Sequence, residues 1–288
     1  MRLLQLQIPN MTGPDVFDWQ TFLKAQGLFQ SGIDSDFGRL SDLATRAYQS
    51  KAGLPADGAV DANTMARALI DGYQSTVGAD VGGMDSDTDC SAYAGQIFAQ
   101  GMRFVARYYS DNRKKALSLA EARELSSAGL AIVAVFENSN NSAGRFSMAT
   151  GQAHAATALR LAATIGQPSG TAIYFAVDYN AKLADLQGPV TQYFSAIKTA
   201  FDAAAKQYAI AVYGSGLTCR VIRDSGMAKF SWIAASIGFA EYATFRKQAD
   251  IVQLAPERTL VPGLSIDDNI GQSAEFGAFR LAAAAIPS

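Results

Sequence analysis

The sequence has little of what many enzyme sites are built from. Among its 288 residues there is one histidine, His154, and there are two cysteines, Cys90 and Cys219. A Ser-His-Asp or Cys-His nucleophile system and a multi-histidine zinc site are therefore not expected, and neither a metal nor a cofactor is expected. The two thiols read as buried side chains rather than as a disulfide framework. Carboxylates are the acid–base groups that remain.

Strong charge of one sign and long apolar runs are also missing. The net charge is −2, so the chain lacks the basic field that drives nucleic-acid binding. No stretch approaches about 18 uninterrupted apolar residues, which argues against insertion into a membrane. Residues 1–15 have no continuous apolar core and no small-residue cleavage site, so no secretory signal is expected. With 49% hydrophobic and 17% charged residues, the composition is typical of a soluble globular monomer with one large and one small domain.

Residues 1–72 have a helical pattern. Apolar side chains recur at helical spacing in three stretches, 15–27, 39–53 and 61–72, and glycines stand at their ends. GLFQSGIDSDFG and GLPADGAVDANT form a weak internal repeat, because each is a Gly-rich turn that follows one helix and leads into the next. The pattern predicts a small all-α domain of three helices, for whose stability tight Gly and Asp turns matter.

A series of short motifs runs through this segment: Gly13 to Val16, Trp19-Gln20, Asp34 to Gly38, Tyr48-Gln49, Gly53-Leu54 and Asp57-Gly58. Their order resembles the peptidoglycan-binding domain type 1 of bacterial and phage cell-wall hydrolases. Ser35 stands where that family has glycine, and Tyr48 where it has phenylalanine. The resemblance implies bacterial peptidoglycan as the binding partner. The alternative is a generic helical bundle whose glycines only make turns.

After residue 72 the composition and the hydrophobic pattern of the sequence change. Residues 73–82 are small and Gly-rich, as in a linker, and residues 83–288 alternate apolar runs with helical stretches. Eight strands that alternate with helices predict an α/β (β/α)8 TIM-like barrel, in which the last two connections are too short for full helices. The candidate strands are 82–85, 102–109, 130–137, 171–178, 209–215, 230–236, 250–254 and 264–268.

Polar and aromatic residues end these strands, and in a barrel the C-terminal strand ends face one shared cavity. A cavity lined by carboxyl groups and aromatic rings, without a set of metal-ligating residues, is suited to binding a sugar. Aromatic rings stack on the apolar faces of the sugar, and acids hydrogen-bond its hydroxyls. Glycoside hydrolysis also needs one carboxylic acid to protonate the leaving oxygen and a second carboxylate as base, nucleophile or orienting group. The strand-end residues are Asp85, Tyr108 or Tyr109, Glu137, Asp178, Tyr213, Trp232, Gln253 and Asp267.

Several of these residues have a structural interpretation of equal weight. Asp85 and Asp267 are explained equally well as turn or helix-cap residues, and Trp232 as a core side chain. Glu137 and Asp178 are harder to dismiss, because each ends an apolar run directly before a polar segment.

Titratable residues elsewhere read as structural. Arg107, inside the second strand, is expected to be a buried partner of one of the acids. Glu121 and Glu124 read as a solvated helix face, and His154 as a structural residue of an Ala-rich helix.

From Gly83 to about Gly277 the chain carries a series of sequence blocks: Gly-Met-Asp85, FVARYYS, SLAEARELSSAGLAIVAVFE, the helix start at Gly151, IYFAVDYN, AVYGS, WIAAS and SIDDN. Their order resembles the glycoside-hydrolase-like domain related to family 25 lysozymes. The resemblance implies a TIM-like barrel with acids at the ends of strands one, three, four and eight. Family 25 lysozymes carry Asp-x-Glu at the fourth strand end, with the Glu as general acid, whereas this chain has Asp178-Tyr179-Asn180.

With that acid absent, Glu137 on the neighbouring strand is expected to act as general acid. Asp178 would be base, nucleophile or acetamido-orienting group, and Asp85 and Asp267 would support charge and substrate position. Substrate contacts are expected from Tyr109, Asn180, Tyr213, Trp232 and Gln253.

The two resemblances together imply a muramidase-like peptidoglycan hydrolase. A wall-binding module ahead of a glycosidase, without a signal peptide, resembles phage endolysins, which accumulate in the host cytoplasm and reach the periplasm and cell wall at lysis. A secreted bacterial enzyme that uses another export route is an alternative. A different class is a wall-binding protein with a catalytically silent barrel, which Asn180 favours and the four acids oppose. An amidase or peptidase lacks both a zinc set and a Cys-His pair.

Overall fold

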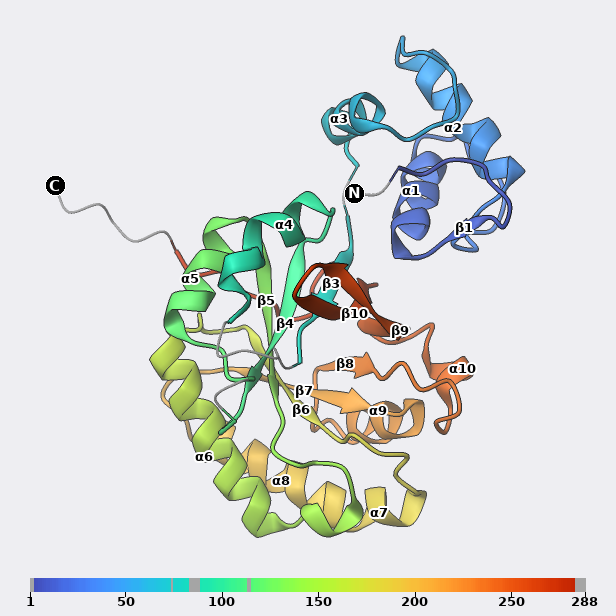
Figure 1. Cartoon of the computed structure of the whole chain (residues 1–288). Coiled ribbons are helices and arrows are strands. Elements are labelled where there is room, and N and C mark those ends of the chain that lie inside the picture. The colour runs from blue at the N-terminus through green and yellow to red at the C-terminus, as the bar shows by residue number, and fades with distance from the viewer. Residues whose placement is uncertain (1–2, 74, 83–88, 113–114, 283–288) are drawn as a thin grey trace, which may run out of the picture. The chain divides into compact units, whose positions relative to one another are not determined.

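The chain folds into two compact units (Figure 1). The computed structural model describes residues 3–73, 75–82, 89–112 and 115–282. The first unit comprises Met1–Val77 with Ala99–Met102, and the second comprises Gly78–Phe98 with Arg103–Ser288. In the described part of the chain, no helix is long and apolar enough to cross a membrane.

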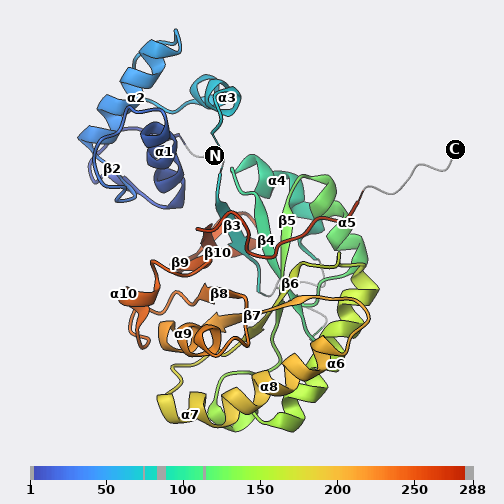
Figure 2. The same ribbon diagram turned by 180° about the vertical axis from the view of Figure 1, so that it is seen from behind.

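The N-terminal unit is built on three helices, as its periodicity predicts. They are α1 (Pro14–Ala25), α2 (Arg39–Lys51) and α3 (Ala62–Ile70), seen from behind in Figure 2. A two-stranded antiparallel sheet of β1 (Met11–Thr12) and β2 (Asp36–Phe37) accompanies them. A strand of two residues is too short to show the alternation of apolar and polar residues by which strands are recognised in a sequence. Only the helices could therefore be predicted.

A buried glutamine organises the first turn of this unit. The side chain of Gln20 is fully buried. Its Nε2 donates to Asp34 Oδ1 at 2.7 Å, to the Asp36 carbonyl at 2.9 Å and to Ser41 Oγ at 3.0 Å. Its Oε1 accepts from the amides of Asp34 and Ser35 at 3.1 and 3.0 Å. The amide group of Gln20 thus provides hydrogen-bond partners for polar groups throughout this turn.

The second turn repeats this arrangement. Gln49 is also buried, and its Nε2 donates to Asp57 Oδ1 and to the Ala59 carbonyl, each at 2.8 Å, and to Thr64 Oγ1 at 3.1 Å. Its Oε1 accepts from the Gly58 amide at 2.9 Å. The weak internal repeat in the sequence is therefore a structural repeat. In each copy a glutamine on one helix hydrogen-bonds the aspartate turn that follows and the start of the next helix.

Replacing Gln20 by leucine should destabilise the N-terminal unit strongly. Several buried donors and acceptors would lose their partner, at about 1–3 kcal/mol for each group left unsatisfied. Hydrogen exchange measured by mass spectrometry resolves this segment from the rest of the chain and should show loss of protection across residues 11–72. The matched control is Gln30→Leu, at an exposed position, which should leave protection intact; equal exchange in the two variants would contradict the role of Gln20.

The second unit is a closed eight-stranded barrel, which confirms the predicted TIM-like architecture. The strand order is β10-β3-β4-β5-β6-β7-β8-β9, and pairing from β3 to β9 is parallel. The strands are β3 (Val77–Asp80), β4 (Phe104–Tyr109), β5 (Ala131–Phe136), β6 (Ala172–Ala176), β7 (Ala209–Gly214), β8 (Phe230–Ile233), β9 (Ile251–Val261) and β10 (Leu264–Gly271).

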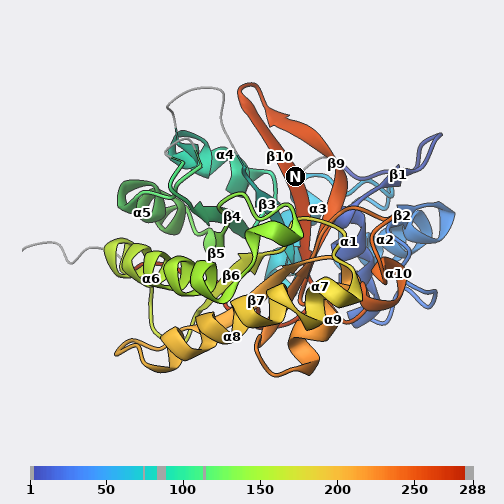
Figure 3. The same cartoon turned by 90° about the horizontal axis from the view of Figure 1, so that it is seen from below.

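Helices surround the parallel strands, and the two longest, α6 and α8, run along the outside of the barrel (Figures 1 and 3). They approach closely at Gly151, where an added Cβ would lie 2.4 Å from the Tyr193 carbonyl oxygen. The helical elements are η1 (Cys90–Tyr93), α4 (Ala94–Ala99), α5 (Leu119–Ser127), η2 (Ala143–Arg145), α6 (Met148–Ile165), α7 (Leu183–Gln187), α8 (Pro189–Asp202), α9 (Gly216–Asp224) and α10 (Tyr242–Phe245).

The barrel closes with a hairpin instead of a further helix crossover. Two residues, Pro262 and Gly263, join β9 to β10, whereas parallel strands need a connection of a dozen or more residues. The chain therefore returns antiparallel, as a long ribbon seen in Figure 3. The short final connection that the sequence indicates thus makes the last strand of the barrel antiparallel to its neighbour β9.

The predicted linker at 73–82 is wrong in part, because β3 lies within it. The Val-Gly-Ala-Asp segment reads as a Gly-rich connector, but an added Cβ at Gly78 would lie 2.4 Å from the ring of Phe104. The glycine makes room for that ring inside the barrel, which explains a strand of such small residues. The predicted first strand at 82–85 and its Asp85 fall mostly on residues 83–88, outside the described residues.

A buried ion pair ties β4 to α5. Arg107 is buried as expected, and its Nε donates to Glu121 Oε1 at 2.5 Å and its Nη2 to Glu121 Oε2 at 3.3 Å. The interpretation of Glu121 as a solvated residue is wrong, since its side chain is fully buried. Cys90 Sγ also donates to Glu121 Oε1, at 2.9 Å. Both Cys90 and Cys219 are free, buried thiols.

Candidate active site

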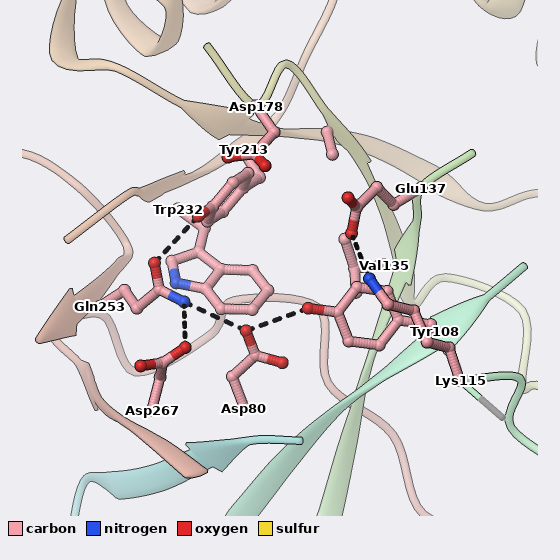
Figure 4. A pocket seen from close by; sticks show the side chains of 11 residues that line it. Asp80, Tyr108, Lys115, Val135, Glu137, Asp178, Tyr213, Trp232, Gln253 and Asp267 are labelled. Carbon is pink, nitrogen blue, oxygen red and sulfur yellow. Dashed lines mark hydrogen bonds and ion pairs between the residues drawn. The ribbon is translucent and has the colours of Figure 1, made fainter. Parts of the chain in front are cut away.

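Polar side chains from the strand ends surround one cavity of about 190 Å³ in the barrel (Figure 4). This volume is below the ~300–1,000 Å³ of sites for drug-sized ligands, so it suits a single ring-sized group. Six of the residues predicted to be catalytic or to contact the substrate meet here. The lining residues are Asp80, Tyr108, Lys115, Val135, Glu137, Ala176, Asp178, Tyr213, Trp232, Gln253 and Asp267.

Of the two tyrosines that end β4, the predicted one, Tyr109, is the wrong choice. Tyr108 lines the cavity, whereas Tyr109 is buried on the opposite side of the strand, and its hydroxyl donates to Gln167 Oε1 at 2.7 Å. Side chains alternate between the two faces of a strand, so a shift of one residue exchanges barrel interior for helix layer. Sequence alone left that register open.

Asn180 does not line the cavity either. Its Oδ1 accepts a hydrogen bond from the backbone amide of Ala240 at 2.9 Å, so it joins the loop after β6 to the loop before α10. Tyr179 also lies outside the lining set, and Asp178 is the member of this motif that faces the cavity.

The carboxyl group missed by the sequence interpretation is Asp80, at the end of β3. The residue is 4% exposed. Its Oδ2 accepts from the Tyr108 hydroxyl at 3.2 Å and from Gln253 Nε2 at 3.1 Å. Burial, helped by the charge of Asp267, raises the pKa of Asp80 to about 7. An acid at the end of a short apolar run was the available signal, but the surrounding glycines concealed the strand.

Gln253 joins the acids to the aromatic wall. Its Oε1 accepts from the Tyr213 hydroxyl at 2.9 Å and from the Ala235 amide at 3.1 Å. Two donors at Oε1 determine the orientation of the amide, so Nε2 faces the carboxyl groups. There it donates to Asp80 Oδ2 and, at 3.3 Å, to Asp267 Oδ2.

Asp267 reaches the cavity by a different route from the one predicted. It lies within β10, which runs antiparallel, at a register shift between Ile266 and Asp268. Such irregularities re-aim side chains near active sites. Asp267 thus faces Gln253, while Asp268 accepts from Arg258 Nε at 2.5 Å. Burial is the main cause that raises the pKa of Asp267.

Glu137 and Asp178 follow the neighbouring strands β5 and β6 and are brought together as expected. Burial raises the pKa of both carboxyl groups, and the charge of Asp178 raises that of Glu137 further. Lys115 opposes these effects in both. Its Nζ lies 3.6 Å from Glu137 Oε2 and 4.9 Å from the centre of the Tyr108 ring. The cation was not foreseen from the sequence.

Trp232 is a packed wall of the cavity rather than an exposed platform. The residue is 1% exposed, and its Nε1 donates to Asn269 Oδ1 at 2.9 Å. Its ring meets Tyr213 edge to face, with centroids 4.9 Å apart. The interpretation as a core side chain is therefore confirmed; the ring also lines the cavity, and its contact with a sugar stays a prediction.

The arrangement is suited to proton transfer. Within the described ranges, no group of three or more His, Cys, Asp and Glu side chains is placed to hold a metal ion. His154 lies outside the cavity lining and its Nδ1 is 3.0 Å from the Tyr193 hydroxyl, a structural contact as expected. Four carboxyl groups with differing surroundings share one cavity, which is how acid and base roles are separated at a given pH.

Two family models match the chain. Residues 96–270 match the "Rv2525c-like, glycoside hydrolase-like domain", and residues 12–67 match the "Putative peptidoglycan binding domain". A Bacillus subtilis protein, YbfG, is 30% identical over 211 residues, which cover 68% of this chain and 29% of YbfG. The chain thus spans about a third of the length of this relative and of FadG from the same organism.

One solved structure supports the barrel. The Tat-secreted protein Rv2525c of Mycobacterium tuberculosis, in complex with HEPES, superposes with a TM-score of 0.56 at 24% identity, covering 70% of this chain and 98% of that one. A family 25 glycosyl hydrolase from Bacillus anthracis has a TM-score of 0.45 at 13% identity, covering 71% and 92%. Because the glycoside hydrolase-like model covers more than half of the residues, the chain belongs to the Rv2525c-like, glycoside hydrolase-like family, with a peptidoglycan-binding domain ahead of the barrel.

Proposed function

We propose that this protein hydrolyses the glycan strands of bacterial peptidoglycan by carboxylate acid–base catalysis, in the manner of a muramidase. The observation that carries the proposal is the cavity in which Glu137, Asp178, Asp267 and Asp80 meet beside aromatic rings. The peptidoglycan-binding domain supports the choice of polymer, and so does a 25% identical relative named "Putative peptidoglycan hydrolase Rv2525c".

The roles proposed for the carboxyl groups follow their surroundings. Glu137, with its pKa raised by burial, is proposed as general acid, and Asp178 as base, nucleophile or acetamido-orienting group. Asp267 supports the substrate. Asp80 joins it in that role, in the place expected for Asp85.

Lys115 should set the pH range of the reaction. Its charge lowers the pKa of both Glu137 and Asp178. In Lys115→Gln the pKa of each carboxyl group rises, so Asp178 ionises at higher pH and Glu137 stays protonated to higher pH. Both limbs of the pH profile of kcat/KM are then expected to move upward. Lys247→Gln, at an exposed position, removes the same charge and should leave the profile in place; limbs that stay fixed in Lys115→Gln would contradict this role.

The test of the function is direct. Purified peptidoglycan, stripped of other envelope material, is incubated with the full-length protein over a range of pH. Loss of turbidity with release of new reducing ends is the expected result, and mass spectrometry of the fragments identifies the bond. Protein that pellets with the walls but releases no fragments at any pH would refute hydrolysis.

That last outcome defines the second candidate, a wall-binding protein with a silent barrel. Asn180 favours it, since it stands where family 25 lysozymes carry their general acid and is engaged with Ala240 instead. The clustered carboxyl groups favour hydrolysis, because a merely structural barrel has no need to keep four acids around one cavity.

The route to the wall is a separate proposal. Accumulation in a host cytoplasm followed by release at lysis, as in phage endolysins, is one route. Export is the other, and the M. tuberculosis relative is described as Tat-secreted. Fractionation of the native producing cells, with immunodetection before and after lysis, distinguishes the two.

A further inference from the structure

Asp80 has one oxygen that the protein leaves unused. Oδ2 accepts two hydrogen bonds, from the Tyr108 hydroxyl and from Gln253 Nε2. Oδ1 is buried and has no hydrogen-bond partner. In Figure 4 the two dashed lines to Asp80 reach Oδ2, and none reaches this second oxygen. Unsatisfied buried polar atoms are rare in folded proteins and call for an explanation.

The hydrogen bonds decide where a proton would reside. The Gln253 amide cannot be turned around, because its Oε1 already accepts from Tyr213 and Ala235. Oδ2 of Asp80 thus faces two donors and acts as the carbonyl oxygen of a neutral acid. With Oδ2 accepting both hydrogen bonds, the proton of that acid is on Oδ1, where no protein acceptor meets it.

The surrounding charges favour this neutral form. Burial contributes most to raising the pKa of Asp80, and the charges of Asp267 on β10 and Glu137 after β5 raise it further when those groups are ionised. Arg107 lowers it but lies on β4 in a bidentate pair with Glu121. The neighbouring Tyr108 and Gln253 side chains are uncharged donors. The result is a pKa of about 7, at which the acid is largely protonated in mildly acidic solution.

We propose that Asp80 binds the glycan as a neutral carboxylic acid, donating a hydrogen bond from Oδ1 to an uncharged oxygen of a sugar seated in the cavity. This inference rests on the proposed glycan substrate. It assigns Asp80 a recognition role that a carboxylate cannot fill, because an ionised acid only accepts hydrogen bonds. Sites of low polarity can keep a carboxylic acid neutral for this purpose.

The experiment measures binding without turnover. The full-length chain carrying Glu137→Gln is titrated with chitotetraose, an uncharged N-acetylglucosamine tetramer, by calorimetry between pH 5.5 and 8.5. With Asp80 intact, Kd should rise by about thirtyfold or more across this range, because only the protonated fraction binds. Thirtyfold is the ratio of protonated fractions for a pKa of about 7, and Glu137→Gln removes a charge that raises this pKa, so the ratio can only become larger. Adding Asp80→Asn should make Kd independent of pH, since the asparagine amide keeps both the acceptor and the donor. Adding Asp80→Ala should weaken binding about three- to tenfold at pH 5.5, the effect of one lost hydrogen bond.

Other results overturn the inference. If the affinity does not change with pH while Asp80 is intact, or increases as pH rises, Asp80 does not act as a neutral donor. The same conclusion follows from an Asp80→Asn variant that binds no better than Asp80→Ala at pH 5.5, and from absence of binding at every pH. Binding elsewhere on the chain is common to all variants, so the differences report on Asp80.

The hydrolase proposal can fail independently. If wild type degrades walls but the affinity is level with pH, the inference fails and the hydrolase stands. If the affinity falls as expected but walls stay intact, the cavity binds sugar without cutting it.

Discussion

Glu137→Gln should lower the rate of glycan release from purified walls by about 10²–10⁴-fold, the usual contribution of a positioned general acid. The glutamine keeps the shape of the side chain but has no proton to give to the leaving oxygen. Because Glu137 is partly exposed, with 21% of its side chain accessible, the substitution should leave the fold intact. Initial rates of reducing-end formation measure the effect, alongside a pelleting assay for wall binding.

The matched control is Glu124→Gln, the same chemical change at an exposed position on α5. Its rate should equal that of wild type, and both variants should pellet with walls as wild type does. A Glu137→Gln protein with full activity would remove Glu137 from the acid role while leaving the enzyme in place, and attention would then turn to Asp178 and its neighbours.

Arg107→Met should lower the stability of the barrel by about 3–5 kcal/mol, as removal of one partner from a buried ion pair does. Glu121 would be left charged, fully buried and without its bidentate donor. For a unit of this size the loss corresponds to a fall in melting temperature of about 10 °C. Thermal unfolding followed by circular dichroism is the measurement.

Two further variants distinguish the contribution of the Arg107–Glu121 ion pair from the effect of leaving one of its charges unpaired. Arg107→Met combined with Glu121→Gln removes both charges and should recover much of the lost stability. Lys198→Met breaks the exposed pair with Asp202, whose side chains are 47% and 63% accessible, and should change stability by about 1 kcal/mol or less. An Arg107→Met protein as stable as Lys198→Met would show that the buried pair contributes nothing.

Periodicity and apolar runs were sufficient to predict the fold class, because they reflect local physical demands. A helix that packs by one face needs apolar residues at helical spacing, and a parallel strand covered on both faces needs an unbroken apolar run. The acids that follow β5 and β6 were therefore recognisable as Glu137 and Asp178, since a charged group directly after such a run must leave the core.

Contacts between distant segments were beyond this reasoning. β3 carries a glycine at position 78 because the ring of Phe104 occupies the space that a Cβ would need, and Glu121 is buried where Arg107 faces it from β4. Neither fact has a local signature, so β3 read as a linker and Glu121 as a solvated residue.

The sequence by itself therefore determined two domains, an eight-stranded barrel and a carboxylate-rich end of that barrel. Tertiary structure decided which atoms meet there. It turned Tyr108 inward and Tyr109 outward, brought Asp267 in from an antiparallel strand, and placed Asp80 beneath Gln253. The physical reason is that composition and spacing determine which segments form strands. The face, direction and protonation of a side chain depend instead on neighbours that only the closed barrel supplies.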